Sequence, residues 1–270
     1  TAWVDSGATI GELYYAIGKN NPEVAFPAGE CPTIGVGGHF SGGAIGMMMR
    51  KHGLSADKVL DATLVDADGR LLDRAGMGED LFWAIRGGGG GSFGIVVSWT
   101  VSLVPVPSVV SAFTVRRLLR HGDEDEEAML RLLTKWQLVA HALPDDLFIK
   151  VAMEPKVNDG GKRRPLVVFK SLFLGNCSGM ITHMGIHLPE LNIKPSGCRE
   201  MNWIQSMLYF YGYTNGQPAE VFLDRTLQPK EYYKIKLDYL TSPIPATGLS
   251  MLFTKIVEHQ GGSIDIDPQG

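Results

Sequence analysis

Residues 26–46 read Phe-Pro-Ala-Gly-Glu-Cys-Pro-Thr-Ile-Gly-Val-Gly-Gly-His-Phe-Ser-Gly-Gly-Ala-Ile-Gly. Seven glycines, one cysteine and one histidine stand within these 21 residues. Glycine carries an entropic cost, which a globular protein accepts mainly where main-chain amides approach a ligand closely or where φ is positive. We therefore expect this segment to cradle a cofactor. A solvated glycine loop with an inert cysteine is the alternative interpretation.

A second glycine-rich segment, residues 86–94, reads Arg-Gly-Gly-Gly-Gly-Gly-Ser-Phe-Gly. It contains a GxGxxG pattern that begins at Gly89 and a GxSxG pattern centred on Ser92. A dinucleotide fingerprint and a nucleophile elbow each require a helix directly after the motif. The residues that follow, 95–104, are β-branched and partly alternating, which predicts a strand. The context therefore argues against both a dinucleotide fold and a serine hydrolase.

The composition is that of a globular chain. The 270 residues are 44% hydrophobic and 20% charged, and the formal net charge is −4. These values argue against disorder and against strong attraction to nucleic acid or to an anionic membrane. The sequence has no run of 18 apolar residues, so we expect no membrane-spanning segment.

Three cysteines, Cys31, Cys177 and Cys198, lie far apart without CxxC spacing. This spacing argues against a structural zinc site and against a dense disulfide framework, and the odd count fits another use for one of them. Asn176 begins an Asn-Cys-Ser sequon, which can accept a glycan only in a secretory compartment. His183 lies four residues before His187, but the sequence places no third metal ligand, so we predict no metal site.

Both ends of the sequence have the character of chain interior. Residues 1–5 alternate like a strand and lack the basic and apolar regions of a signal peptide. Residues 267–270 form no polar tail. We therefore expect the sequence to be an internal part of a longer protein.

Hydrophobic periodicity and turn residues predict an α+β fold. A capping box at Thr9 and Glu12 precedes apolar residues at helical spacing, and a composition change near residues 105–110 indicates a domain boundary. The expected helices are 10–20, 47–53, 79–85 and 123–141, and the expected strands lie in 1–5, 58–74 (a hairpin), 95–104, 109–119, 147–154 and 165–174. The second half is thus predicted to form an antiparallel sheet covered by helices.

Residues 31–43 resemble the flavin-attachment segment of the plant berberine bridge enzyme-like oxidoreductases, which belong to the vanillyl-alcohol oxidase group of FAD proteins. Residues 78–96 are similar to the second flavin-contacting segment of the same family, and the likeness extends over essentially the whole chain. The resemblance implies that residues 1–107 are the C-terminal part of a PCMH-type FAD-binding domain. Residues 108–270 would then be a substrate domain, incomplete at its C-terminus.

The resemblance also implies roles for individual residues. Cys31 would bond covalently to FAD, His39 would lie near the pyrimidine edge of the flavin, and Ile34 would control the access of dioxygen. A positive or hydrogen-bonding group at that edge raises the redox potential of the flavin. His39 and Ile34 are therefore the candidate catalytic residues. The candidate cofactor-binding residues are Cys31, Pro32, Thr33, Gly35, Gly37, Gly38, His39, Ser41, Gly42, Gly43, Gly46, Gly91, Ile95 and Val96.

The sequence departs from the family at two positions. Ile45 stands where many members have an active-site tyrosine, and Leu237 stands where a serine is usual. A second flavin link in the family comes from a histidine N-terminal to the present sequence, and the catalytic base comes largely from segments after residue 270. The change at Ile45 weakens the assignment of an alcohol-oxidising site.

The resemblance implies an FAD-dependent oxidoreductase that oxidises a hydroxyl group of a carbohydrate or plant phenolic alcohol by hydride transfer. Ile34 favours a dehydrogenase over an oxidase. The alternative is a non-catalytic flavin-binding or secreted surface protein. Expected partners are a small-molecule substrate and an unidentified electron acceptor, with no nucleic acid and no membrane insertion. We expect a secreted plant glycoprotein of the cell wall or apoplast.

Overall fold

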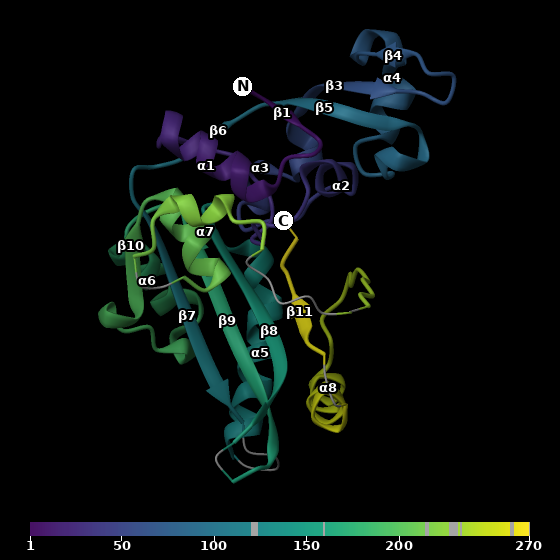
Figure 1. The fold of residues 1–270 in the computed structure, drawn as a ribbon. Coiled ribbons are helices and arrows are strands. Elements are labelled where there is room, and N and C mark those ends of the chain that lie inside the picture. Colours follow the sequence, from purple (N-terminus) through teal and green to yellow (C-terminus); the bar gives the residue numbers. More distant parts are fainter. Residues whose placement is uncertain are drawn as a thin grey trace. The chain divides into compact units, whose positions relative to one another are not determined.

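The structure is a computed structural model that describes residues 1–119, 124–158, 160–213, 216–226, 232, 234–259 and 262–269. The chain divides into two compact units, which are described separately (Figure 1). The first comprises Thr1–Val109 and Met201–Glu231, and the second comprises Val110–Glu200 and Tyr232–Gly270. The first change of unit falls in the predicted boundary region. Residues 201–231, however, belong with the first unit, whereas the predicted division places them in the substrate domain.

Helix α1, Ile10–Asn20, opens the first unit after strand β1, Ala2–Asp5. The predicted capping box forms, with the backbone N–H of Glu12 donating to Thr9 Oγ1 at 3.2 Å and that of Thr9 donating to Glu12 Oε2 at 2.8 Å. These bonds satisfy amide groups that a helix N-terminus otherwise leaves without partners. The apolar face of α1, with Leu13 and Tyr14, is buried. The helix predicted at residues 10–20 is therefore confirmed.

A four-stranded antiparallel sheet in the order β1-β5-β3-β4 forms the frame of the first unit. Its other strands are β3, Val59–Val65; β4, Leu71–Leu72; and β5, Ile95–Val101. The predicted hairpin at 58–74 is thus confirmed, and a strand follows the second glycine segment as predicted. A separate pair joins β2, Val24–Ala25, to β6, Val104–Pro105.

Short helices connect these strands. They are α2, Val36–Ser41; α3, Met49–His52; η1, Ser55–Lys58; α4, Arg74–Ala84; and η2, Gly90–Ser92. Helix α4 is interrupted at Gly78, whose φ of 70° only glycine adopts readily. The helix predicted at 79–85 therefore corresponds to the part of α4 that follows this break.

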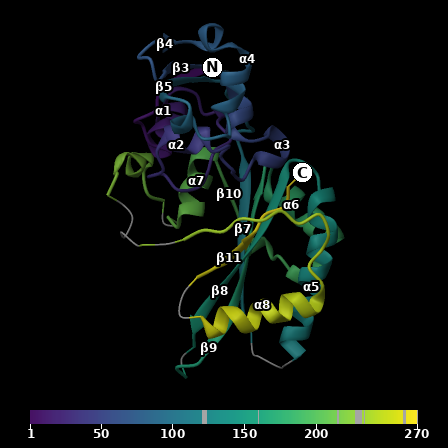
Figure 2. The same ribbon diagram turned by 90° about the vertical axis from the view of Figure 1, so that its right-hand side faces the viewer.

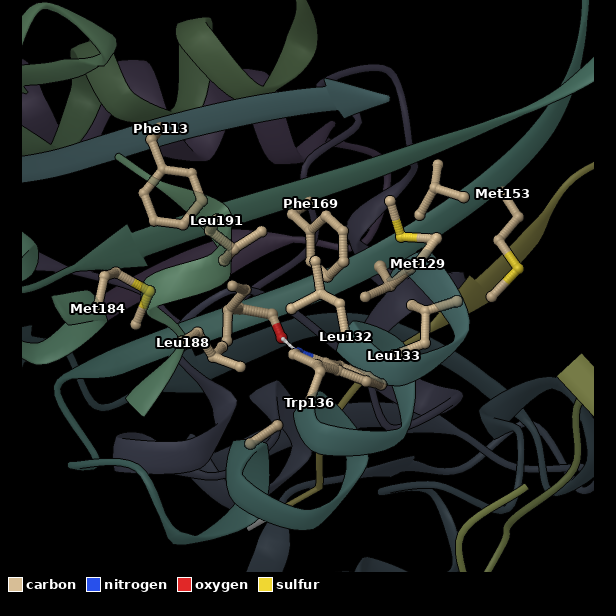
Figure 3. Close-up of a cluster of buried hydrophobic side chains, with 14 of the residues drawn as sticks. Phe113, Met129, Leu132, Leu133, Trp136, Met153, Phe169, Met184, Leu188 and Leu191 are labelled. Atoms are coloured by element: carbon tan, nitrogen blue, oxygen red, sulfur yellow. Dashed lines mark hydrogen bonds between the residues drawn. The ribbon is translucent and has the colours of Figure 1, made fainter. Parts of the chain in front are cut away.

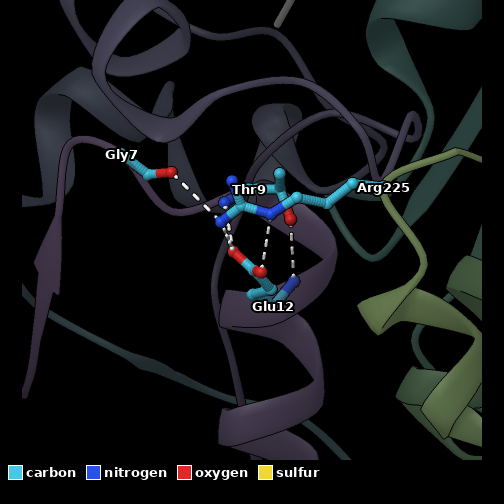
Figure 4. A network of polar contacts seen from close by, with 4 residues as sticks. All are labelled: Gly7, Thr9, Glu12 and Arg225. Carbon is cyan, nitrogen blue, oxygen red and sulfur yellow. Dashed lines mark hydrogen bonds and ion pairs between the residues drawn. The ribbon is translucent and has the colours of Figure 1, made fainter.

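The segment 201–226 returns to the first unit with α7, Trp203–Tyr211, and η6, Ala219–Leu223. The Trp203 ring meets the Tyr14 ring edge-on with their centroids 4.9 Å apart. Arg225 also forms an ion pair with Glu12. Its guanidinium donates to both carboxylate oxygens of Glu12, at 2.9 and 2.7 Å, and to the carbonyl of Gly7 at 3.2 Å (Figure 4). The hydrogen bonds from Arg225 lower the pKa of Glu12. Apolar packing and this ion pair together explain why the segment belongs to the first unit.

The second unit is built on a five-stranded sheet in the order β10-β7-β9-β8-β11. The strands are β7, Val110–Leu118; β8, Leu147–Val157; β9, Arg163–Phe173; β10, Cys198–Met201; and β11, Ile264–Ile266. Strand β9 pairs antiparallel with both β7 and β8, and β11 pairs antiparallel with β8. The strands predicted at 109–119, 147–154 and 165–174 are confirmed.

Longer helices accompany this sheet (Figure 2). They are α5, Glu124–Val139; α6, Cys177–His187; and α8, Ala246–Glu258. The shorter helices are η3, Ala140–Ala142; η4, Pro189–Leu191; and η5, Pro195–Gly197. Residue 123, at which the predicted helix begins, lies outside the described residues, and the rest of that helix is confirmed as α5 and η3.

The core of the second unit lies between these helices and one face of the sheet (Figure 3). Phe169 from β9 and Trp136 from α5 are among its fully buried side chains. The indole N–H of Trp136 donates to the carbonyl of Ile149 at 3.2 Å, so this buried polar group is satisfied. The predicted α+β class, with antiparallel sheets and covering helices, is confirmed.

Cys177 and Cys198 form a disulfide that links the start of α6 to β10 across a sequence separation of 21. The spacing of the three cysteines in the sequence does not specify which two form a disulfide. Cys31 takes no part in this bond. Among the described residues, no helix has both the length and the apolar character needed to cross a membrane.

Candidate cofactor site

The two glycine-rich segments meet at the C-terminal end of α2. The backbone N–H groups of Gly87 and Gly89 both donate to the carbonyl of Ser41 at 2.9 Å. The Ser41 hydroxyl turns back and donates to the Gly37 carbonyl at 2.7 Å. One residue of the first segment therefore anchors the second through the backbone.

The glycines of these segments fall into two groups by what surrounds them. At Gly35, Gly38 and Gly91, an added Cβ would have no described atom within 4 Å. At Gly46, it would overlap the carbonyl oxygen of Ala28, and at Gly37 it would lie 2.9 Å from Ser6 Cβ. The backbone at Gly35, Gly38 and Gly91 is thus accessible to a ligand. At Gly46 and Gly37, by contrast, glycine is needed because another part of the chain packs closely against the backbone. This arrangement fits a flavin cradle because accessible backbone occurs in both segments.

Backbone hydrogen bonds join the loop that carries Cys31 to the start of α1. The Ile10 N–H donates to the Ile34 carbonyl at 2.9 Å, and the Gly11 N–H donates to the Pro32 carbonyl at 2.8 Å. A side chain on Gly11 would come within 2.8 Å of Pro32 Cβ. The helix and its capping box therefore fix the position of the loop.

Cys31 is half-buried and is not enclosed in the apolar core. The nearby Tyr14 is fully buried and donates its hydroxyl to the Gly29 carbonyl at 2.8 Å. Burial, with smaller contributions from Glu30 and Cys31, raises the pKa of Tyr14 far above its ordinary value. The phenol remains protonated and holds the backbone two residues before Cys31.

His39 belongs to α2, and its ring reaches back to Gly29, near the start of the same segment. The Gly29 N–H donates to His39 Nε2 at 2.9 Å. This bond assigns the proton of the neutral ring to Nδ1. Burial lowers the pKa of His39 from 6.5 to about 4. At neutral pH the ring is therefore uncharged, and Nδ1–H remains as its donor. Of the two roles considered for this residue, hydrogen bonding is favoured over positive charge.

We expect His39 to make the protein less stable as the pH falls from about 6.5 to about 4. The unfolded chain takes up a proton near pH 6.5 while the folded ring stays neutral, so the stabilisation is complete above pH 6.5 and disappears towards pH 4. The total change is at most about 3 kcal/mol. His39→Gln keeps an acceptor for Gly29 and should reduce this pH dependence in urea denaturation. An identical pH dependence in the variant would contradict the assignment.

The remaining predicted residues lie in or beside the two segments. Pro32 is buried and Thr33 is half-buried, and Gly42 caps the end of α2. Gly43 has a φ of 98°. Ile95 is 71% exposed at the start of β5, and the next residue, Val96, is half-buried. Ile34 and Ile45 are each 36% exposed, so both are available at the surface of the first unit.

Sequence reasoning missed two contributors. Gly29 accepts a hydrogen bond from the Tyr14 hydroxyl through its carbonyl and donates one to His39 through its N–H. Tyr14 has the helical spacing of an ordinary core residue, and no signal in the sequence marks its bond to Gly29. Both contacts depend on the fold, which brings α1 and α2 to the same loop.

Other candidate sites in the structure do not coincide with the glycine segments. The rings of His183 and His187 stack on α6 with their centroids 6.5 Å apart, and the described part of the chain contains no group of three potential metal ligands. A surface pocket of about 310 Å³ lies beside α1 and α7, where Tyr15, Lys19 and Ile204 contribute to its lining. None of the predicted site residues lines this pocket.

Residues 1–74 match a family model described as an FAD binding domain. The berberine bridge enzyme-like protein Cyn d 4 of Cynodon dactylon is 48% identical over 270 residues, which are 100% of this chain and 49% of the relative. The monolignol oxidoreductase AtBBE-like 13 of Arabidopsis thaliana is 45% identical over 272 aligned positions, which cover 100% of this chain and 50% of the relative. The chain spans about half the length of these curated relatives.

The crystal structure of Phl p 4, described as a grass pollen allergen with glucose dehydrogenase activity, is similar to this fold. It is 43% identical with a TM-score of 0.89, and the match covers 99% of this chain and 52% of that chain. A Phl p 4 variant described as a glucose oxidase, also 43% identical, matches with a TM-score of 0.90 over the same shares. It carries an isoleucine-to-valine change and, five positions later, an asparagine-to-histidine change.

Proposed function

The chain belongs to the berberine bridge enzyme-like family of FAD proteins, and we propose that the protein is an FAD-dependent oxidoreductase. Its substrate would be a hydroxyl-bearing carbohydrate or a plant phenolic alcohol. The observation that carries the proposal is the accessible backbone at Gly35, Gly38 and Gly91 in two segments that are hydrogen-bonded through Ser41. A solvated loop would not require this link between the segments.

In this proposal, each part of the site has a defined task. The glycine backbones bind and orient FAD, and Cys31 holds it through a thioether. His39 presents Nδ1–H as a hydrogen-bond donor because Nε2 is occupied by Gly29. When bound, FAD supplies a ring that accepts a hydride and then accumulates negative charge along one edge. A neutral donor at that edge stabilises the charge without requiring a buried cation.

The substrate class is supported by what the relatives are described as doing. One relative is described as a monolignol oxidoreductase, and another has glucose dehydrogenase activity. Both descriptions are compatible with oxidation of a hydroxyl-bearing molecule. For this chain, the carbohydrate and the phenolic alcohol therefore remain the two substrate classes to test.

A preference for dehydrogenase over oxidase activity is supported by Ile34. This residue and His39 are five positions apart, as are the two substitutions of the Phl p 4 variant described as a glucose oxidase. If the two pairs correspond, Ile34 matches the isoleucine that Phl p 4 has before the change, and His39 matches the histidine that its variant has after the change. We propose that the larger side chain of Ile34 hinders dioxygen, so that another acceptor takes the electrons.

We expect Ile34→Ala to raise oxygen consumption during turnover by roughly ten-fold, which corresponds to a barrier change of about 1.4 kcal/mol. Ile186→Ala is the control, because Ile186 is also an exposed isoleucine but lies on α6, outside the glycine segments. The measurement is oxygen uptake by the full-length protein at saturating substrate. Equal rates in the wild type and Ile34→Ala would refute the role of this residue.

The catalytic proposal is tested by anaerobic incubation of the full-length protein with sugars and phenolic alcohols. A substrate should bleach the flavin absorbance. The competing proposal, a flavin-binding protein without catalysis, is favoured by Ile45 in place of the family tyrosine. Flavin absorbance that persists with every hydroxyl compound would reject catalysis and support that alternative.

Secretion is part of the proposal. The disulfide between Cys177 and Cys198 supports an oxidising compartment. A relative described as a grass pollen allergen supports the same location. Recovery of the full-length plant protein in the apoplastic fluid is the expected result, and exclusive recovery inside the cell would contradict it.

A further inference from the structure

Asn176 begins Asn-Cys-Ser, and this is the sole Asn-X-Ser/Thr sequence with X other than proline among the 270 residues. The structure places Asn176 directly before α6 in the second unit, at a distance in sequence from every residue of the flavin cradle. Both Asn176 and Ser178 are exposed. The side chains that define the sequon are therefore at the surface.

The contacts of Asn176 are compatible with an attached sugar. Its side-chain oxygen accepts a hydrogen bond from the Gly179 N–H at 3.0 Å and thereby caps α6. N-glycosylation modifies the amide nitrogen and leaves this oxygen in place. The modified side chain can therefore keep the helix cap, and the folded second unit can accommodate the glycan at its surface.

The neighbouring disulfide supports the required compartment. Cys177, the central residue of the sequon, is bonded to Cys198. Structural disulfides persist in the secretory pathway and outside the cell, where N-glycosylation also takes place. Residues 176–178 thus contain both the acceptor sequence and a disulfide-bonded cysteine, and each of these is expected of a protein that passes through the secretory pathway.

From these observations we propose that Asn176 is an N-glycosylation site and that it is modified before α6 and the disulfide form. The donor is an oligosaccharide on a lipid pyrophosphate. The amide nitrogen of Asn176 bonds to the first sugar carbon, the bond from that carbon to the pyrophosphate oxygen breaks with its electron pair, and the amide proton is released. The proposal is independent of the flavin chemistry.

The order of events follows from the hydrogen bonds of the folded segment. The Cys177 N–H donates to Glu200 Oε1 at 2.8 Å, and the Met180 N–H donates to the Asn176 carbonyl at 3.1 Å. A transferase that must bind the backbone of the sequon finds these groups engaged once α6 has formed. Closure of the disulfide further restrains the segment through Cys198.

The test is peptide mass spectrometry of the full-length protein secreted from plant cells, focused on residues 171–194. The wild type should carry a glycan on Asn176, and Ser178→Thr should retain it. Ser178→Ala should lose the glycan. Asn176→Asp is the matched control for the fold because it retains a capping oxygen and removes the acceptor amide. An unmodified Asn176 peptide in the secreted wild type overturns the site.

Cys198→Ser tests the proposed order. It leaves the sequon intact but prevents the disulfide, so the acceptor segment stays accessible for longer. Glycan occupancy at Asn176 should therefore be at least as high as in the wild type when both are purified from whole cells before secretion. Lower occupancy in Cys198→Ser overturns the order.

Discussion

Replacement of Gly46 by alanine is expected to lower the free energy of unfolding of the first unit by about 3 kcal/mol or more. The new Cβ would overlap the carbonyl oxygen of Ala28, and its separation from the carbonyl carbon would be 2.7 Å. Backbone atoms cannot rotate away as a flexible side chain can. Any shift of Ala28 also moves Gly29, whose bonds to His39 and Tyr14 would weaken.

Gly7→Ala is the matched control for this prediction. Gly7 also lies in the first unit, its φ is not positive, and an added Cβ has no atom of the described structure within 4 Å. We expect a change within about 0.5 kcal/mol. Hydrogen exchange of peptides from the first unit of the full-length protein measures both variants. If Gly46→Ala exchanged like the wild type, the close packing assigned to Gly46 would be wrong.

Replacement of Gly38 by valine is expected to remove most of the bound flavin while the fold is retained. Gly38 lies in α2, one residue before His39, and its backbone is accessible. A valine side chain would fill the space in which we propose that the cofactor approaches the backbone. The ratio of flavin to protein absorbance in the purified full-length protein should fall at least ten-fold, a loss of about 1.4 kcal/mol or more in binding.

Gly185→Val provides the comparison for Gly38→Val. Gly185 is also an exposed helical glycine with no described atom within 4 Å of an added Cβ, but it lies on α6 of the second unit. The same substitution there should leave the flavin content unchanged. Loss of flavin from both variants would point to an effect of valine on the helices, and full flavin content in Gly38→Val would contradict the cradle.

The sequence predicted those elements whose stabilisation is local. Thr9 and Glu12 cap α1 within a single turn, so the capping box could be recognised without knowledge of the fold. The alternation in β8 from Ile149 to Glu154 likewise follows from burial of one face, whereas β9 is buried on both faces and reads as a continuous apolar run. The two glycine segments were also evident, because close approach of the backbone requires glycine wherever it occurs.

Contacts between distant segments could not be predicted in this way. The return of residues 201–226 depends on Trp203 meeting Tyr14 and on Arg225 reaching Glu12. None of these side chains has a sequence pattern that specifies its partner. The disulfide was missed for the same reason, since three cysteines allow more than one pairing. At the candidate site, the Ser41 carbonyl is a backbone group, and its role depends on geometry alone.

The central claim is that residues 26–46 hold FAD with Cys31 as the attachment point. Its most direct test is proteolysis of the denatured full-length protein, followed by visible absorbance and mass measurement of the peptide spanning residues 20–50. A second flavin link would join this peptide to another through the same flavin, and the adduct would then be measured as the linked pair of peptides. We expect flavin absorbance and a flavin-mass adduct on Cys31. A colourless peptide with an unmodified Cys31 would contradict it.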